Sequence, residues 1–107
     1  MSNKYIDFDT LKFMLYEVHG LEKMLNKKRF EDYDKETIDM FLESIKDFSD
    51  RELFPVFKEM DEKPAYYEDG KIHVHDKVKT LMHQGGEMGI ISASFDYKDG
   101  GMQMPLI

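Results

Sequence analysis

The chain contains no cysteine among its 107 residues. Disulfide bridges and thiolate metal sites are therefore excluded as means of holding the fold together, which suits a reducing compartment. Long apolar runs are also missing. No stretch approaches the roughly 18 apolar residues that a membrane-spanning helix needs, and the N-terminus has no uninterrupted apolar run of the signal-peptide kind. We therefore expect a cytoplasmic protein without a membrane partner.

Basic side chains are too few to balance the acidic ones. The chain has 15 lysines and arginines against 22 aspartates and glutamates, which gives a net charge of −7. An acidic protein repels nucleic acid and anionic lipid, so neither is an expected partner. Apolar residues make up 41% of the chain and charged residues 35%, as is ordinary for a soluble domain. The length allows one domain with a single modest core.

The N-terminal part predicts a helix from about residue 8 to Gly20. Apolar side chains recur there at helical spacing, Asp9 or Thr10 is placed to cap the start, and Gly20 is placed to end the helix. The apolar face comprises Phe8, Leu11, Leu15 and Val18. A further helical turn is expected after Gly20, followed by a charged connector that Phe30 and Tyr33 pin to the body.

The clearest predicted element is a long helix over residues 35–60, with Asp34 as its N-cap. Pro55 removes one helical hydrogen bond and clashes with the preceding turn. Because the apolar stripe stays in phase on both sides of Pro55, one helix kinked there is the prediction, and two shorter helices are the alternative. The stripe comprises Ile38, Phe41, Leu42, Ile45, Phe48, Leu53, Val56, Phe57 and Met60.

The period of the sequence changes after this helix. Apolar residues flank the pair Asp69-Gly70, which predicts a small β-hairpin near residues 66–74. Asp76 is then expected to cap a last helix that Gly85 and Gly86 end. The sum is an all-α fold, a small antiparallel bundle of three or four helices with a minor hairpin.

His73 and His75 form the most suggestive cluster for chemistry. Side chains at i and i+2 of a strand share one face, and such a pair can hold zinc or iron. Only His19 and His83 could add imidazole ligands, and there is no Glu-x-x-His at helical spacing. Surface or helix-capping histidines are therefore expected, and a metal enzyme is kept as the third alternative.

No other residue type forms a catalytic pattern. The serines lack the small-residue elbow of a nucleophile, and Gly100-Gly101 has neither the lysine nor the following helix of a phosphate loop. Most carboxylates of the long helix are expected on its solvated face; they are Glu36, Asp39, Glu43, Asp47, Asp50 and Glu52. Methionines 88, 102 and 104 are the candidates for contact with something outside this chain. No catalytic, cofactor-binding or metal-binding residue is predicted.

Four stretches occur in a characteristic order over about residues 6 to 105. They are FDTLKFMLYEVHGLEKML, FEDYDKETIDMFLESIKDFSDRELFPVFKEMD, EDGKIHVHDKVKTLMHQGG and YKDGGMQMP. In this order they resemble the N-terminal region of acyl-CoA dehydrogenases, in particular the larger bacterial branch with an extra N-terminal helical segment. The chain departs from the family at Glu87, where tryptophan is usual, and at Gln103, where glycine is usual.

The resemblance implies that residues 1–33 are an N-terminal helical extension and that residues 34–107 begin the family's N-terminal helical domain. The parent would be an FAD-dependent oxidoreductase of fatty acid metabolism, in which a glutamate takes the α-proton of an acyl-CoA and FAD accepts hydride from Cβ. The family's flavin contacts, glutamate base and most of its acyl pocket belong to later domains. The chain is therefore expected to be a truncated, inactive scaffold without bound FAD, whose partner is the remainder of the parent polypeptide and, through it, the acyl-CoA substrate.

The apolar stripe of the long helix supports an incomplete unit. It holds more large apolar side chains than two short companion helices cover, so self-association through exposed apolar surface is expected of the isolated chain. The alternative function is a free-standing helical module whose stripe binds a partner helix.

Overall fold

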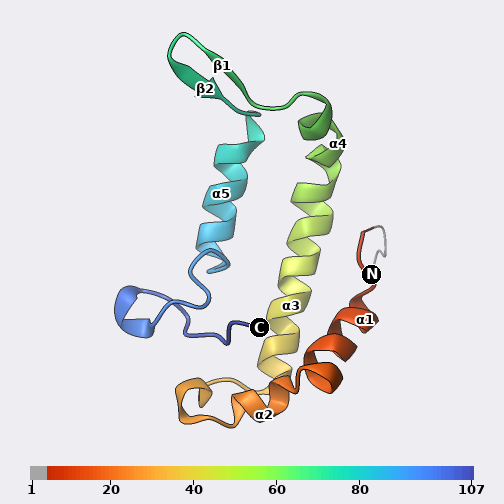
Figure 1. Cartoon of the computed structure of the whole chain (residues 1–107), viewed down its shortest axis with the longest axis vertical. Coiled ribbons are helices and arrows are strands. Elements are labelled where there is room, and N and C mark those ends of the chain that lie inside the picture. The colour runs from red at the N-terminus through yellow and green to blue at the C-terminus, as the bar shows by residue number, and fades with distance from the viewer. Residues whose placement is uncertain (1–4) are drawn as a thin grey trace. The chain divides into compact units, whose positions relative to one another are not determined.

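The computed structural model describes residues 5–107 (Figure 1). Most of it is helical, and one short antiparallel hairpin is the only sheet in this range, which confirms the predicted fold class. In chain order the elements are α1 (Phe8–Phe13), a π-helical turn (Met14–Val18), α2 (Leu21–Leu25), a 3-10 turn (Lys28–Phe30), α3 (Lys35–Phe48), a π-helical turn (Ser49–Leu53), α4 (Phe54–Glu62), β1 (Tyr66–Glu68), β2 (Lys71–His73), α5 (Lys77–Glu87) and a 3-10 turn (Tyr97–Asp99).

The chain forms two compact units. Unit 1 contains the residues up to Leu42 together with Ser92–Ile107, and unit 2 is Glu43–Ile91. Helix α3 therefore begins in unit 1 and continues into unit 2. The division of a parent protein between residues 33 and 34 stays a prediction.

Helix α3, the π-helical turn and α4 follow one another without a break from Lys35 to Glu62. The predicted long helix is thus present, and its interruption takes the form of a π-helical turn just before Pro55. The amide of Phe54 donates to the carbonyl of Ser49, five residues back, which is the hydrogen-bond spacing of a π-helix. Pro55 is the second residue of α4, so the wider hydrogen-bond spacing comes directly before the residue that lacks an N–H.

The predicted cap of the first helix needs correction. Helix α1 is capped by Asp7, not by Asp9 or Thr10: the Asp7 carboxylate accepts from both of their amides, at 3.1 and 3.3 Å. The predicted cap of α3 is confirmed, because the amide of Thr37 donates to Oδ1 of Asp34 at 2.8 Å. Gly20 also behaves as predicted, since its φ of 64° places it in the left-handed region where the helical segment ends.

The glycines of α5 do not end that helix. Gly85 and Gly86 lie inside α5, which continues to Glu87. The end comes at Gly89, whose φ of 79° is left-handed. The amides of Gly89 and Ile90 then donate back to Gly86 and Gly85, both at 3.0 Å, and so satisfy the last helical carbonyls. A Gly-Gly pair was the wrong stop signal because the left-handed residue that closes the helix is three residues further on.

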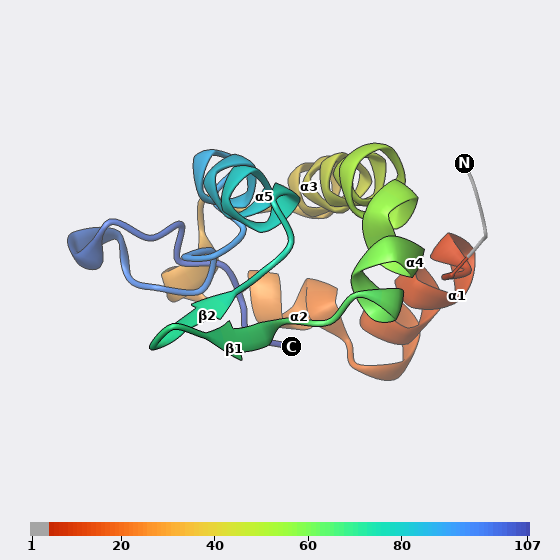
Figure 2. The same cartoon turned by 90° about the horizontal axis from the view of Figure 1, so that it is seen from above.

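The hairpin has the register expected for a two-residue turn. Tyr66 pairs with His73 and Tyr67 with Ile72, while Asp69 and Gly70 both have positive φ. Two successive left-handed residues are the requirement of a type I′ turn, which Asp-Gly meets at low cost. Figure 2 shows this hairpin leading from α4 into α5 within unit 2.

The core of unit 1 is small. Leu21, Leu25 and Ile38 are buried, and the side chains packed against them are Leu15, Tyr16, Phe30, Tyr33 and Leu42. The prediction that Phe30 and Tyr33 pin the connector is confirmed by these contacts. The first part of the long helix, through Ile38 and Leu42, thus packs against α2 and the connector that follows it.

Unit 2 contains a buried cation. The side chain of Lys46 is 4% exposed, and its Nζ lies 2.7 Å from both carboxylate oxygens of Asp50, one helical turn along. A buried ammonium group is tolerated only when it is paired in this way. Within the described residues, no helix is both long and apolar enough to cross a membrane.

Candidate functional site

His73 is engaged inside the hairpin. Its ring stacks on that of Tyr66, its cross-strand partner, with centroids 5.0 Å apart, and its Nε2 lies 3.3 Å from the backbone oxygen of Glu68. These contacts use the face and one nitrogen of the imidazole. They give His73 a role in holding the two strands together.

His75 caps helix α5. Its Nδ1 accepts a hydrogen bond from the backbone N–H of Lys77 at 3.1 Å, and its Nε2 lies 3.4 Å from Oε2 of Glu59 in α4. The prediction that Asp76 caps this helix is wrong for its side chain, which makes no capping hydrogen bond. The imidazole one residue earlier does so instead, as expected of a helix-capping histidine. Across residues 5–107, no group of three or more histidine, cysteine, aspartate or glutamate side chains is arranged to hold a metal ion.

The carboxylates of the long helix do not all face solvent. Glu36, Glu43 and Asp47 are exposed, as predicted. Asp39 is half-buried and accepts a 2.6 Å hydrogen bond from the hydroxyl of Tyr16, and Asp50 pairs with Lys46. Burial, followed by the hydrogen bond to Asp39, raises the pKa of Tyr16 well above its ordinary value. The first contact joins two helical segments and the second lies within the long helix, and neither forms an acid–base pair of catalytic type.

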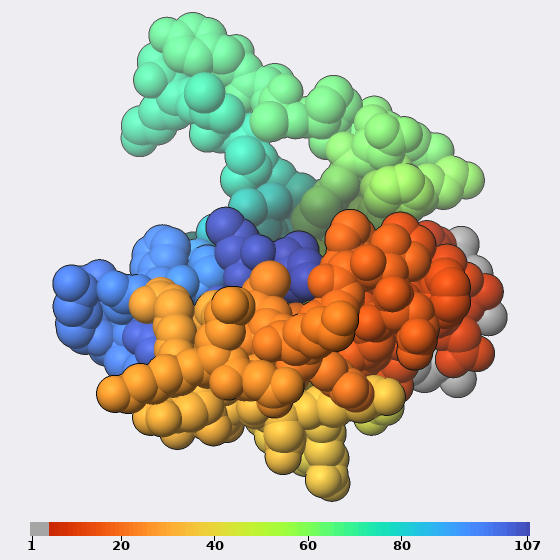
Figure 3. Space-filling model, turned by 60° about the horizontal axis from the view of Figure 1, so that its bottom comes forward, coloured from red at the N-terminus to blue at the C-terminus, as the bar shows by residue number. Residues whose placement is uncertain are grey.

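Residues 92–104, here called the closing loop, lie against residues 29–33, here called the connector. Figure 3 shows the two segments, blue and orange, side by side on one face of unit 1. Two of their links are made to backbone oxygens: the hydroxyl of Tyr33 donates to Met102 and the side-chain amide of Gln103 to Arg29, the latter at 2.9 Å.

Two further links join charged or phenolic side chains. Arg29 pairs with Asp96, and the hydroxyl of Tyr97 donates to Asp32 at 3.0 Å. The closing loop is thus held to the connector at four points, although the residues involved are more than 60 positions apart in the chain.

The closing loop folds back on itself around Gly101. Gly100 has a left-handed φ of 84°, and the amides of Gln103 and Met104 donate to the carbonyls of Phe95 and Ala93, both at 2.8 Å. Met104 is 7% exposed. The expectation that Met104 contacts something outside this chain is therefore wrong, because its side chain is already buried.

Two side chains of this network, Asp96 and Tyr97, have a shifted pKa. The hydrogen bond and positive charge of Arg29 lower the pKa of Asp96. Hydrogen bonding with Tyr33, followed by burial and by the carboxylate of Asp32, raises the pKa of Tyr97 above its ordinary value. At the start of α3, the amide of Thr37 lowers the pKa of Asp34.

Acid should weaken unit 1 through Asp34 and Asp96. Both have a lower pKa in the folded chain, so each contributes stability that is present above the ordinary carboxyl pKa of about 3.9 and is lost as pH falls through the folded value. Through these two groups we expect no change in the stability of unit 1 from about pH 7 to 5, and a fall of its urea midpoint below about pH 4. Asp34→Asn keeps a good capping residue but cannot titrate, so its midpoint should fall less steeply. An equally steep fall in this variant would contradict the assignment.

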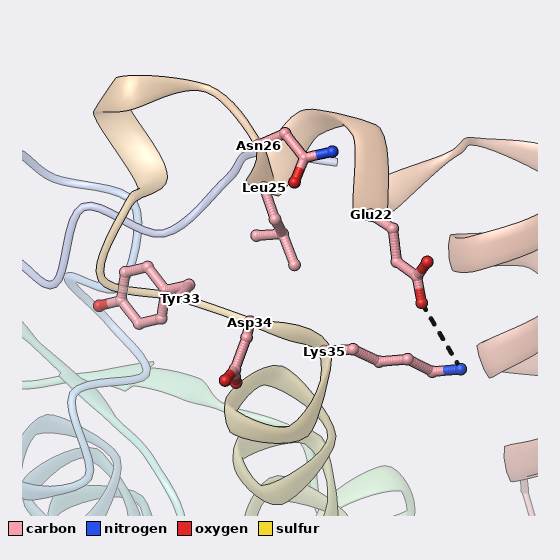
Figure 4. A pocket seen from close by; sticks show the side chains of 6 residues that line it. All are labelled: Glu22, Leu25, Asn26, Tyr33, Asp34 and Lys35. Atoms are coloured by element: carbon pink, nitrogen blue, oxygen red, sulfur yellow. Dashed lines mark ion pairs between the residues drawn. The ribbon is translucent and has the colours of Figure 1, made fainter.

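A surface pocket of about 240 Å³ lies beside the connector (Figure 4). Its lining residues are Glu22, Leu25, Asn26, Tyr33, Asp34 and Lys35, all in unit 1. Figure 4 shows the ion pair that spans one side, in which Nζ of Lys35 lies 3.7 Å from Oε1 of Glu22. The pocket offers two carboxylates against one ammonium group, over an apolar floor that includes the buried Leu25.

None of the four links between the closing loop and the connector was predicted from the sequence, apart from the anchoring role of Tyr33. Arg29, Asp32 and Tyr97 have no local pattern that marks them, because an ion pair between residues 29 and 96 leaves no period in either segment. In the closing loop, the Gly100-Gly101 pair indicated a turn but not its partners.

No model of a known protein family matches the chain, and neither a curated protein nor a solved structure matches it.

Proposed function

We propose that this chain is the N-terminal helical region of an acyl-CoA dehydrogenase-like flavoprotein, with a scaffolding role. The observation that carries the proposal is the order of the elements. Helices α1 and α2 lie on the first stretch that resembles the family, the long helix through Pro55 on the second, the hairpin and α5 on the third, and the closing loop on the fourth. The order of the four stretches in the chain supports this proposal more than any one motif does.

The pocket of unit 1 does not fit FAD. At about 240 Å³ it is smaller than the roughly 300–1,000 Å³ of usual ligand pockets. Glu22 and Asp34 at its rim would repel the diphosphate of the cofactor, and Lys35 is already shared with Glu22. We therefore assign no flavin contact and no catalytic step to this pocket. In the proposed parent, both belong to the remainder of the polypeptide.

The 107-residue chain should bind no flavin. After incubation with FAD and gel filtration, we expect no flavin absorbance in the protein fractions and no dye reduction when an acyl-CoA is added. The reason is the absence from the pocket of the size and charge that the cofactor needs. Stoichiometric, tight binding of FAD would contradict the fragment proposal, because it would place a complete flavin site in these residues.

A free-standing interaction module is the second candidate, and the exposed apolar side chains favour it. Phe57 and Met40 on the long helix are 64% and 63% exposed, and Tyr67 and Ile72 on the hairpin are 74% and 73% exposed. Side chains of this size at the surface tend to recruit another protein or another copy of the chain. Sedimentation over a range of concentrations measures the second outcome, and a monomer at all concentrations argues against self-association.

A further inference from the structure

His75 occupies the junction of three elements of unit 2. It lies two positions after His73, the last residue of β2, and just before the first turn of α5. Its side chain is 16% exposed and reaches Glu59 on α4, while its backbone oxygen accepts from the amide of Val78 at 3.0 Å. One residue thus connects the return strand of the hairpin to the two helices that flank it.

The hydrogen bond from Lys77 fixes the protonation state of this ring. A backbone N–H can only donate, so Nδ1 of His75 must carry a lone pair and the ring proton must be on Nε2, which faces Glu59. The neutral Nε2–H tautomer is therefore the one that both caps α5 and presents a donor to the carboxylate. No second side chain replaces the cap, because Asp76 makes no capping hydrogen bond.

A second proton on the ring removes the cap. Once Nδ1 carries hydrogen it cannot accept from Lys77, and the imidazolium charge then lies at the positive end of the α5 dipole. The charged groups around the ring act in opposite directions. Glu59 on α4 attracts the imidazolium, but its side chain is 55% exposed and screened by water. The side chain of Asp76 precedes the helix and makes no capping hydrogen bond, while Lys77 adds positive charge at the first turn.

We propose that His75 is a proton-sensitive latch, which in its neutral form caps α5 and bridges it to Glu59 on α4, and which releases the first turn of α5 when it is protonated. Histidine is the side chain that ordinarily changes charge near neutral pH, with a reference value of about 6.5. The latch acts at the base of the hairpin that carries the exposed Tyr67 and Ile72.

The test is nitrogen-15 NMR of the 107-residue chain. At neutral pH the imidazole shifts of His75 should report the Nε2–H tautomer, and acidification through the imidazole titration should lower the hydrogen-exchange protection of the Lys77 amide about three- to tenfold. Protection in the middle of α5, at Leu81, should change much less. A Nδ1–H tautomer, or protection of Lys77 that does not follow the titration of His75, would overturn the proposal.

Two variants separate the latch from general acid effects. His75→Asn keeps a capping acceptor that does not titrate, so the Lys77 amide should stay protected at both pH values. His73→Gln removes the neighbouring imidazole and should leave the pH dependence of Lys77 as in the parent chain. A His75→Asn chain that loses protection on acidification as the parent does would contradict the assignment to His75.

Discussion

Leu21→Ala should lower the free energy of unfolding by about 2–5 kcal/mol. Leu21 is the most buried side chain described, at 2% exposed, and it lies in the centre of the three-residue core of unit 1. Truncation removes its apolar area from the core and leaves a cavity that Leu25 and Ile38 fill only in part. Because unit 1 has few other buried apolar residues, it has little capacity to compensate. Urea unfolding followed by circular dichroism measures the change.

Val18→Ala is the matched control. Val18 lies three residues before Leu21 but is 54% exposed, so the same kind of truncation should change stability by less than about 0.5 kcal/mol. Equal effects of the two substitutions would show that the core is not centred on Leu21.

Gly101→Ala should destabilise the closing loop by about 1–3 kcal/mol. A Cβ at this position would lie 2.2 Å from the carbonyl oxygen of Phe95 and 2.4 Å from its Cβ. The obstacle is mainly backbone, so a change of side-chain rotamer does not relieve the overlap. That carbonyl also accepts from the amide of Gln103, so displacing it breaks the turn that buries Met104. Hydrogen exchange of the Gln103 and Met104 amides should rise together with the loss of stability.

Gly86→Ala, the same substitution at another glycine, should have the opposite effect on stability. Gly86 lies inside α5 with nothing within 4 Å of the position a Cβ would occupy. Alanine is favoured over glycine in a helix by about 1 kcal/mol, so this variant should be more stable than the parent chain. If Gly101→Ala were neutral while Gly86→Ala stabilised, the close approach of residues 95 and 101 would be disproved.

Local pattern was sufficient for the long helix and the hairpin. The stripe through residues 38–60 and the Asp69-Gly70 turn both act within one element, where the period of the side chains and the backbone preference of a few residues decide the outcome. The π-helical turn was not predicted, although a disturbance of the helix at Pro55 was. The sequence marks where a helix is disturbed but not which hydrogen-bond spacing absorbs the disturbance.

Helix caps were predicted less well because side chains that can cap stand close together at the start of α1 and of α5. At α1 the prediction was Asp9 or Thr10, whereas the structure has Asp7, because the position of a cap depends on the backbone angles at the first turn. At α5 the accepting group is the ring nitrogen of His75, while the aspartate that follows it has the more usual capping side chain. The residue type shows which side chains can cap a helix, but the backbone geometry decides which of them does.

Apart from the anchoring role of Tyr33, the links between the connector and the closing loop could not be predicted from the sequence. The pair of Arg29 with Asp96 and the pair of Asp32 with Tyr97 join segments that have no common period. Both segments are rich in charge, and a charged residue in a loop is compatible with solvent as well as with a distant partner. Only the fold decides between these environments.

The exposed apolar side chains connect the fold to the proposed function. Phe57 belongs to the stripe that predicted the long helix, yet most of its surface is exposed in unit 2. A scaffold that packs against the rest of a flavoprotein accounts for this exposure, and so does a module that binds a separate helix. The two proposals differ in what the complete gene product contains.

The most direct measurement is therefore made on the complete product of the gene that encodes these residues, expressed and purified in its native form. The proposal predicts a protein several hundred residues longer than this chain that carries bound FAD and reduces a dye when an acyl-CoA is supplied, while the 107-residue chain alone does neither. A complete gene product without flavin, inactive on acyl-CoA, would contradict the proposal and leave the helical interaction module as the better account.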